Sequence, residues 1–204
     1  MYKTIRKPII TIASVLLLNG CAAVADSMSK MAGIGVVTEE VSTFDNATIV
    51  NMSPAFLHAE GSWGNNIKLG ARWSSKSPDY AALVLSYSSD VSSSRSAYLN
   101  LSGLDINIDG KITSYKTGRL TNHEGSDYNN VTRTIYTKSE NAVVVPYSIL
   151  EQMVEAKDCR LRIHTSKGYE DAQFSIERIP GGQGTAILPM REFVANINSK
   201  TGKL

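Results

Sequence analysis

The chain has 204 residues, of which 21 are Lys or Arg and 19 are Asp or Glu, so its formal net charge is +2. This near balance excludes the strongly basic surface with which nucleic-acid-binding proteins neutralise phosphates. The hydrophobic content of 42% and the length suffice for one ordinary core, and only two cysteines are present.

The first twenty residues have the pattern of a cleavable secretion signal. Lys3, Arg6 and Lys7 precede a short apolar run over residues 9–18. That run is shorter than the roughly 20 apolar residues that cross a bilayer. A basic start, a short apolar stretch and a small residue such as Gly20 before the break are typical of a signal peptide that is removed.

The end of this segment resembles the lipobox of bacterial lipoproteins, in which Leu, a small residue and Gly or Ala precede a Cys. Leu18, Gly20 and Cys21 match that pattern, and the resemblance covers residues 1–23. It implies that residues 1–20 are cut off and that the Cys21 thiol is acylated. Two acyl chains, at about 0.8 kcal/mol per buried CH₂, anchor a protein stably. In enterobacterial lipoproteins an Asp after the Cys retains the protein in the inner membrane, so Ala22 implies the outer membrane and a periplasmic location.

Removal of the signal changes the charge and leaves one free thiol. The mature chain has 18 basic and 19 acidic residues, because three basic residues leave with residues 1–20. We expect a lipidated tether over residues 21–42 and a single β-rich domain over residues 43–204. Cys159 then has no disulfide partner, and alternation with Leu161 and Ile163 predicts that it lies on the core face of a strand.

The body of the sequence predicts mainly strands. Alternating apolar residues or β-prone runs occur at residues 47–52, 66–73, 80–88, 97–109, 111–117, 131–138, from 159, and at 172–179. The turn-forming residues 74–79 predict that the second and third of these pair as a hairpin.

Two segments predict helices. At about 147–157, Ser148 and Glu151 have the spacing of a capping box before an apolar stripe. At about 189–199, Pro189 suits a first helical turn. The predicted fold class is therefore α+β, a mainly antiparallel β-sheet or sandwich with two packed helices.

The segment 105–110 supports two interpretations. Asp105, Asn107 and Asp109, followed by Gly110, resemble the first half of a calcium-binding loop of the EF-hand type, but Lys116 occupies the position of the bidentate acid. The same residues fit a β-hairpin with a two-residue Asp-Gly turn, which needs no metal. We expect the hairpin, with a metal site as the alternative.

Candidate binding residues lie in the strand from Cys159, whose other face carries Arg160, Arg162 and His164. These side chains could meet an anionic headgroup, a polysaccharide or an acidic partner, or they could be a solvated strand face paired to a neighbour such as Glu177. We expect no catalytic residue and no cofactor. In a hydrolase alternative, His123 and Glu124 are the candidates, although adjacent residues do not easily form a triad.

Three functions are consistent with these patterns. The first is a non-catalytic lipoprotein that binds an envelope protein or polysaccharide, or assists an assembly. The second is a periplasmic hydrolase with a site assembled from distant residues. The third is a calcium- or glycan-binding module at the edge formed by residues 105–109. No nucleic-acid partner is expected. A pocket with converging titratable groups would favour the second over the first.

Overall fold

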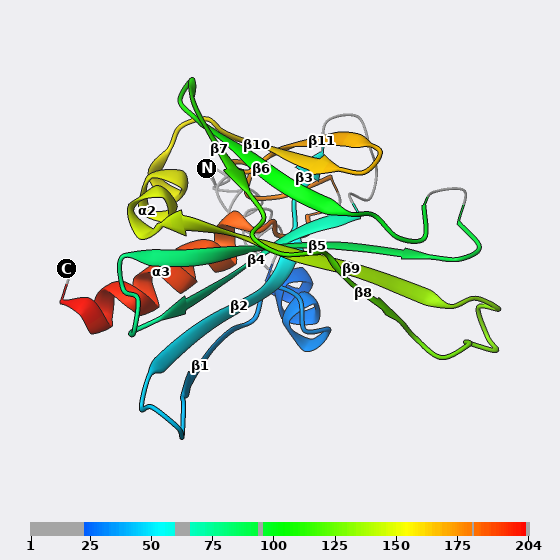
Figure 1. Cartoon of the computed structure of the whole chain (residues 1–204), viewed down its shortest axis with the longest axis horizontal. Coiled ribbons are helices and arrows are strands. Elements are labelled where there is room, and N and C mark those ends of the chain that lie inside the picture. The colour runs from blue at the N-terminus through cyan, green and yellow to red at the C-terminus, as the bar shows by residue number, and fades with distance from the viewer. Residues whose placement is uncertain (1–22, 60–65, 94–95, 181, 203–204) are drawn as a thin grey trace, which may run out of the picture.

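The computed structural model describes residues 23–59, 66–93, 96–180 and 182–202. It is an α+β fold built of two antiparallel sheets with helices at one end, as the sequence predicted (Figure 1). The predicted signal peptide and Cys21 lie outside the described residues.

The larger sheet has six strands in the order β1-β2-β4-β5-β9-β8. These strands are β1 (Val37–Val41), β2 (Thr48–Phe56), β4 (Ile67–Ser74), β5 (Tyr80–Asp90), β9 (Tyr136–Pro146) and β8 (Asn122–Gly125). The predicted hairpin is β4–β5, in which Trp73 pairs with Ala81. Alternation of apolar and polar residues along both strands explains why one side of this hairpin is buried.

The smaller sheet has five strands in the order β3-β11-β10-β6-β7. These strands are β3 (His58–Ala59), β11 (Gly168–Gln173), β10 (Cys159–Thr165), β6 (Leu101–Ile108) and β7 (Lys111–Lys116). The β6–β7 turn confirms the predicted Asp-Gly hairpin, because Asp109 and Gly110 have φ values of 49° and 93°. Positive φ at both central positions is the requirement of a type I′ turn.

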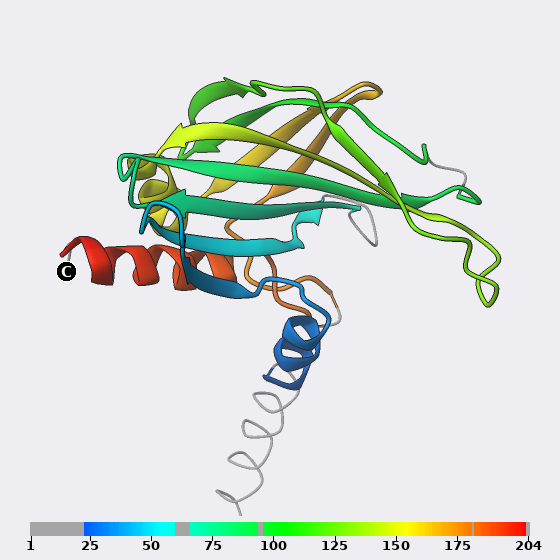
Figure 2. The ribbon, with the colours of Figure 1, turned by 60° about the horizontal axis from the view of Figure 1, so that its bottom comes forward.

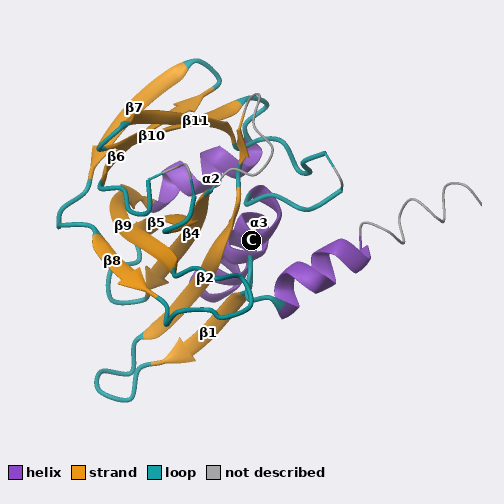
Figure 3. Ribbon diagram, turned by 90° about the vertical axis from the view of Figure 1, so that its right-hand side faces the viewer, coloured by secondary structure: helices purple, strands orange, loops and turns teal. Residues whose placement is uncertain are grey.

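The core lies between the sheets and continues under the helices (Figure 3). Leu104 and Ile163 face it from the smaller sheet, and Leu83 and Val143 from the larger one. Cys159 is fully buried on this side, as its alternation with Leu161 predicted. Burial raises the pKa of the Cys159 thiol to about 12.

The sheets meet at a polar seam along β9. The inward residues Ser139 and Asn141 are buried although they are polar. Asn141 Nδ2 donates to the carbonyl oxygens of Leu101 at 2.8 Å and Arg119 at 3.0 Å, and Ser139 Oγ accepts from the Leu99 amide at 3.2 Å. Side chains therefore satisfy backbone groups where the chain passes from one sheet to the other.

Two helices close one end of the sandwich. They are α2 (Tyr147–Glu155) and α3 (Ile187–Thr201), and α3 runs against β1, β2 and β4 (Figure 1). The capping-box prediction was wrong. The helix α2 begins at Tyr147 directly after Pro146, which has no side-chain cap bond, so Ser148 is already inside the helix. Pro189 lies in the first turn of α3, whose N-cap is Ala186.

Three predicted strands have shifted limits. The strand predicted at 97–109 is β6, which begins only at Leu101. Residues 130–133 form a turn, in which Asn129 Oδ1 accepts from the amides of Val131 and Thr132 at 2.9 and 3.0 Å. Thr134 makes only an isolated bridge to Asn129, and β9 starts at Tyr136. The strand predicted at 172–179 is β11, which ends at Gln173. The next amide, that of Phe174, donates to the Cys159 carbonyl at 2.8 Å, and the chain turns away.

The described part of the segment expected to be a tether contains a helix and a strand. Residues 23–31 are helical, and β1 pairs with β2 from Val37 to Val41. The folded body therefore begins before residue 43. β1 has no clear pattern in the sequence, because its side chains are mostly exposed and it is an edge strand held by backbone bonds.

Candidate functional site

The outward side of the five-stranded sheet carries three rows of mainly polar side chains, which we call the polar face. Residues in register on neighbouring strands point to the same side of a sheet. In the order β7, β6, β10 and β11, the rows are Ile112, Asn107, Arg160 and Gln173; Ser114, Asp105, Arg162 and Asp171; and Lys116, Gly103, His164 and Tyr169. Two sets of candidate residues that are distant in the sequence therefore lie together on this face. They are the candidate metal ligands of β6 and the basic residues of β10.

The middle row contains a bidentate ion pair. Arg162 Nε and Nη2 each donate to an oxygen of Asp171 at 2.8 Å. The Arg162 guanidinium also lies 4.0 Å from the ring centre of Tyr169. The hydrogen bonds from Arg162 lower the pKa of the Asp171 carboxyl and raise that of the guanidinium, so both groups are charged at neutral pH.

Asp105 links the middle row to the third row. His164 Nε2 lies 2.9 Å from Asp105 Oδ2. Desolvation raises the pKa of the Asp105 carboxyl, but hydrogen bonds from Ser114 and His164 outweigh it, and the pKa falls below its ordinary value. Asp105 is therefore an ionised acceptor with partners on both neighbouring strands.

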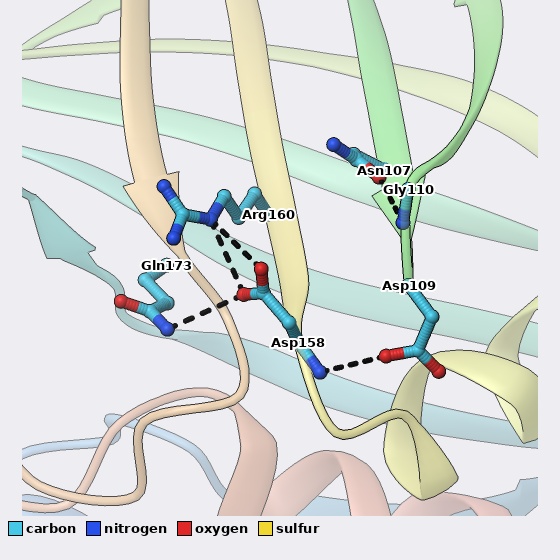
Figure 4. Close-up of polar contacts among 6 residues, drawn as sticks. All are labelled: Asn107, Asp109, Gly110, Asp158, Arg160 and Gln173. Carbon is cyan, nitrogen blue, oxygen red and sulfur yellow. Dashed lines mark hydrogen bonds and ion pairs between the residues drawn. The ribbon is translucent and has the colours of Figure 1, made fainter.

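A third acidic residue, Asp158, holds the side chains at the end of the polar face (Figure 4). Arg160 Nε donates to both oxygens of Asp158, at 3.2 and 3.1 Å, and Gln173 Nε2 donates to Asp158 Oδ1 at 3.4 Å. The Asp158 amide in turn donates to Asp109 Oδ1 at 2.9 Å, which ties the β6–β7 turn to the start of β10. The expected partner of the basic stripe, Glu177, pairs with Arg191 instead.

The three side chains that would bind calcium in the alternative interpretation each make a different hydrogen bond. Asn107 Oδ1 accepts from the Gly110 amide at 2.9 Å inside the turn, Asp109 Oδ1 accepts from the Asp158 amide, and Asp105 contacts His164. Within the described ranges, no cluster of three or more His, Cys, Asp or Glu side chains could hold a metal ion. The hairpin accounts for each of these residues.

A hollow of about 250 Å³ lies on the polar face over the first two rows. Its lining includes Asp105, Asn107, Arg162 and Asp171, with Gln173 at one side and Ile112 at the other. Carboxylates supply acceptors, guanidinium groups supply donors, and amides supply both. The hollow can therefore hold a polar ligand by several hydrogen bonds at once.

The residues of the hydrolase alternative lie elsewhere, on the edge strand β8. His123 Nδ1 is 3.0 Å from Ser139 Oγ, and His123 Nε2 is 3.1 Å from Asn100 Oδ1. This order of groups resembles a catalytic triad, but Ser139 is 0% exposed, so a substrate cannot reach its hydroxyl. The contact is a cross-strand pair, since His123 and Ser139 face each other in register. Glu124 accepts from Asn122 and does not join His123.

Several residues of the polar face were missed from the sequence. Tyr169, Asp171 and Gln173 alternate along β11, and this period of two was the available signal. The predicted strand at 172–179 started too late to include the first two. Their partners, Arg162 and Arg160, were recognised only as a basic stripe.

Comparisons with protein family models, curated proteins and solved structures find no match for this chain.

Proposed function

We propose that this chain is a lipid-anchored protein of the bacterial outer membrane that faces the periplasm and binds an envelope polysaccharide through its polar face, without catalysis. The lipobox-type residues Leu18, Gly20 and Cys21 support the anchor, and Ala22 supports the outer membrane as the address. Among the residues that the structure describes, no helix has the length and apolar character needed to span a bilayer.

The polar face carries the proposal of a polysaccharide ligand. The three cationic side chains of the polar face, Arg160, Arg162 and Lys116, are equalled in number by the carboxylates of Asp105, Asp158 and Asp171, so the surface does not favour a polyanion. A sugar presents hydroxyl groups that both donate and accept, and the hollow offers both kinds of partner. Tyr169 and Ile112, 59% and 64% exposed, add apolar contact at the margin. Ion pairs already hold Arg162 and Asp171 in place, which reduces the entropy lost on binding.

The same contacts support the proposal of binding without catalysis. Asp105 is ionised and hydrogen-bonded on both sides, and the Asp171 carboxylate is occupied by Arg162. Glycoside hydrolysis needs one protonated carboxyl group with a raised pKa beside an ionised one. Both carboxyls of this hollow have a lowered pKa, so neither is suited to act as the acid.

Co-sedimentation with purified, insoluble cell-wall polysaccharide tests the ligand. Asn107→Ala and Gln173→Ala each remove hydrogen-bonding groups beside the hollow without leaving an unpaired charge. We expect each to weaken binding about 2- to 10-fold, the value of one hydrogen bond. Gln152→Ala on α2 removes the same amide group outside the polar face and should bind normally. Unchanged binding by both polar-face variants would exclude this ligand surface, and capture of an envelope protein instead would assign the face to a protein partner.

The anchor has a separate test. Cys21→Ser removes the thiol that receives the lipid, so labelling with a palmitate analogue should be lost in cells. Retention of the label on Cys21→Ser would contradict the lipoprotein proposal. A Cys159→Ser variant is the matched control, since Cys159 is buried and should not affect labelling.

A further inference from the structure

The helix of residues 23–31, here called the first helix, has an exposed apolar side. Val24, Met28 and Met31 are 60%, 65% and 88% exposed. At about 100° per residue these three side chains fall within an arc of about 60°. The first helix projects from the body beside α3 and outside the two sheets (Figures 2 and 3).

The opposite side of the first helix is docked on the body by polar contacts. Asp26 accepts from Arg178 Nη1 and Nη2 at 3.0 and 2.8 Å, and Lys30 Nζ donates to Glu192 at 2.9 Å. Gly184 permits this approach, because a Cβ there would lie 2.8 Å from Asp26 Oδ1. A surface helix usually buries its apolar side and exposes its polar side. Here the arrangement is reversed, so the apolar residues are not needed for docking.

The C-terminal end of the first helix is also fixed. The amide of Gly33 donates to the Lys30 carbonyl at 3.0 Å and that of Ile34 to the Ser29 carbonyl at 2.9 Å, with Gly33 at a φ of 74°. This is a Schellman termination, which suits glycine. Ser53 Oγ then donates to the Gly33 carbonyl at 2.7 Å and ties the turn to β2. The first helix therefore has a defined angle to the body.

The position of Cys21 indicates what contacts the exposed apolar side of the first helix. Only three residue steps separate Cys21 from Val24, and an extended chain spans at most about 3.6 Å per residue. An acylated Cys21 therefore holds Val24 within about 11 Å of the lipid surface. Amphipathic helices at a bilayer surface bury their apolar side about 5–10 Å deep.

We propose that Val24, Met28 and Met31 insert into the lipid interface beside the acylated Cys21, and that the docked polar side then holds the body at a fixed orientation to the membrane. This inference rests on the lipid anchor of the proposed function. The occupant of the apolar side is the bilayer itself. The polar contacts to Arg178 and Glu192 transmit the orientation of the first helix to the sheets.

Site-directed fluorescence on the mature, acylated protein tests the inference. Met28→Cys and Lys167→Cys each receive an environment-sensitive dye in vesicles of phosphatidylethanolamine and phosphatidylglycerol. Lys167 is exposed in the β10–β11 turn, and Cys159 is buried and should not label. We expect a blue shift and quenching by brominated lipid at position 28, and neither effect at position 167. In Arg178→Ala the effects at position 28 should persist, while energy transfer from position 167 to a lipid acceptor should change.

Each part of the inference can fail separately. A dye at position 28 that stays unquenched while the protein co-sediments with the vesicles would overturn the insertion and leave the anchor intact. Protein that lacks acyl chains and does not co-sediment would overturn the anchor and the insertion together. Unchanged energy transfer from position 167 in Arg178→Ala would overturn the role of the docked side in orienting the body.

Discussion

The first helix and α3 pack on the same body in opposite ways. α3 turns Met190, Phe193 and Ile197 into the core, and all three are fully buried. The first helix makes its contacts with charged and hydroxyl side chains and leaves Met28 and Met31 exposed. Apolar burial gives α3 a place in the cooperative fold, whereas exposed ion pairs contribute little each. The two helices should therefore differ in stability as well as in what contacts their apolar side chains.

Thiol reactivity offers the largest expected contrast between buried and exposed positions. Burial raises the pKa of Cys159 to about 12, and the residue is inaccessible. In protein free of vesicles, a thiol introduced by Met28→Cys is exposed to solvent. We expect maleimide at pH 8 to react with position 28 more than about a thousandfold faster than with Cys159. Mass spectrometry of labelled peptides measures both rates, and denaturant should abolish the difference. Comparable native rates would show that the core face of β10 is assigned wrongly.

Truncation of one large side chain on each helix should separate their contributions to folding. Phe193→Ala removes a fully buried ring from α3 and should cost about 3–5 kcal/mol of unfolding free energy. Met31→Ala on the first helix should change it by less than about 0.5 kcal/mol. Denaturant unfolding of the mature protein measures both values. A large loss with Met31→Ala would mean that the apolar side of the first helix packs on the body.

Patterns of period two accounted for the parts of the fold that depend on local sequence. The β4–β5 hairpin, the Asp109-Gly110 turn and the inward side of Cys159 follow from alternation and turn chemistry alone. The polar seam could not be found this way. Ser139 and Asn141 occupy inward positions with polar side chains, so they interrupt the apolar alternation of β9. These two side chains are polar because they hydrogen-bond to the backbone of residues 97–121, which lies beside them only in the folded chain.

The polar contacts of the first helix and of the polar face could not be predicted from the sequence either. Asp26 and Arg178 are 152 residues apart, and nothing local marks them as partners. His164 and Asp105 are 59 residues apart and meet because β10 lies beside β6. Sheet order depends on long-range packing, and a single sequence does not encode it in any short pattern. The residue types of the polar face were therefore predictable, but their pairing was not.

Removal of the main ion pair should loosen the first helix without weakening the body. Arg178→Ala eliminates both bonds to Asp26, whose side chain is about as exposed as that of Arg178, at 35% and 34%. Such a pair is worth about 0.2–1 kcal/mol, so local opening should rise up to about 5-fold. The rate of tryptic cleavage after Lys30 measures the opening. Arg191→Ala removes the same charge from an exposed pair on α3 and is the control. A fall in the global unfolding free energy of more than about 1 kcal/mol with Arg178→Ala would show that the first helix belongs to the cooperative core.

Salt should produce the smallest effect and distinguish the two modes of docking. At 1 M ionic strength the screening length falls to about 3 Å, so the pairs of Asp26 with Arg178 and Lys30 with Glu192 should weaken. Apolar packing of α3 is not weakened in this way, so its hydrogen exchange should stay slow. We expect cleavage after Lys30 to accelerate modestly in NaCl relative to a neutral peptide substrate, which corrects for the protease itself. The Arg178→Ala variant should respond less, because it has already lost one of the pairs. Equal salt responses of the native protein and the variant would place the docking energy in contacts other than the Asp26–Arg178 pair, and the polar attachment of the first helix would then have to rest on Lys30 and Ser29.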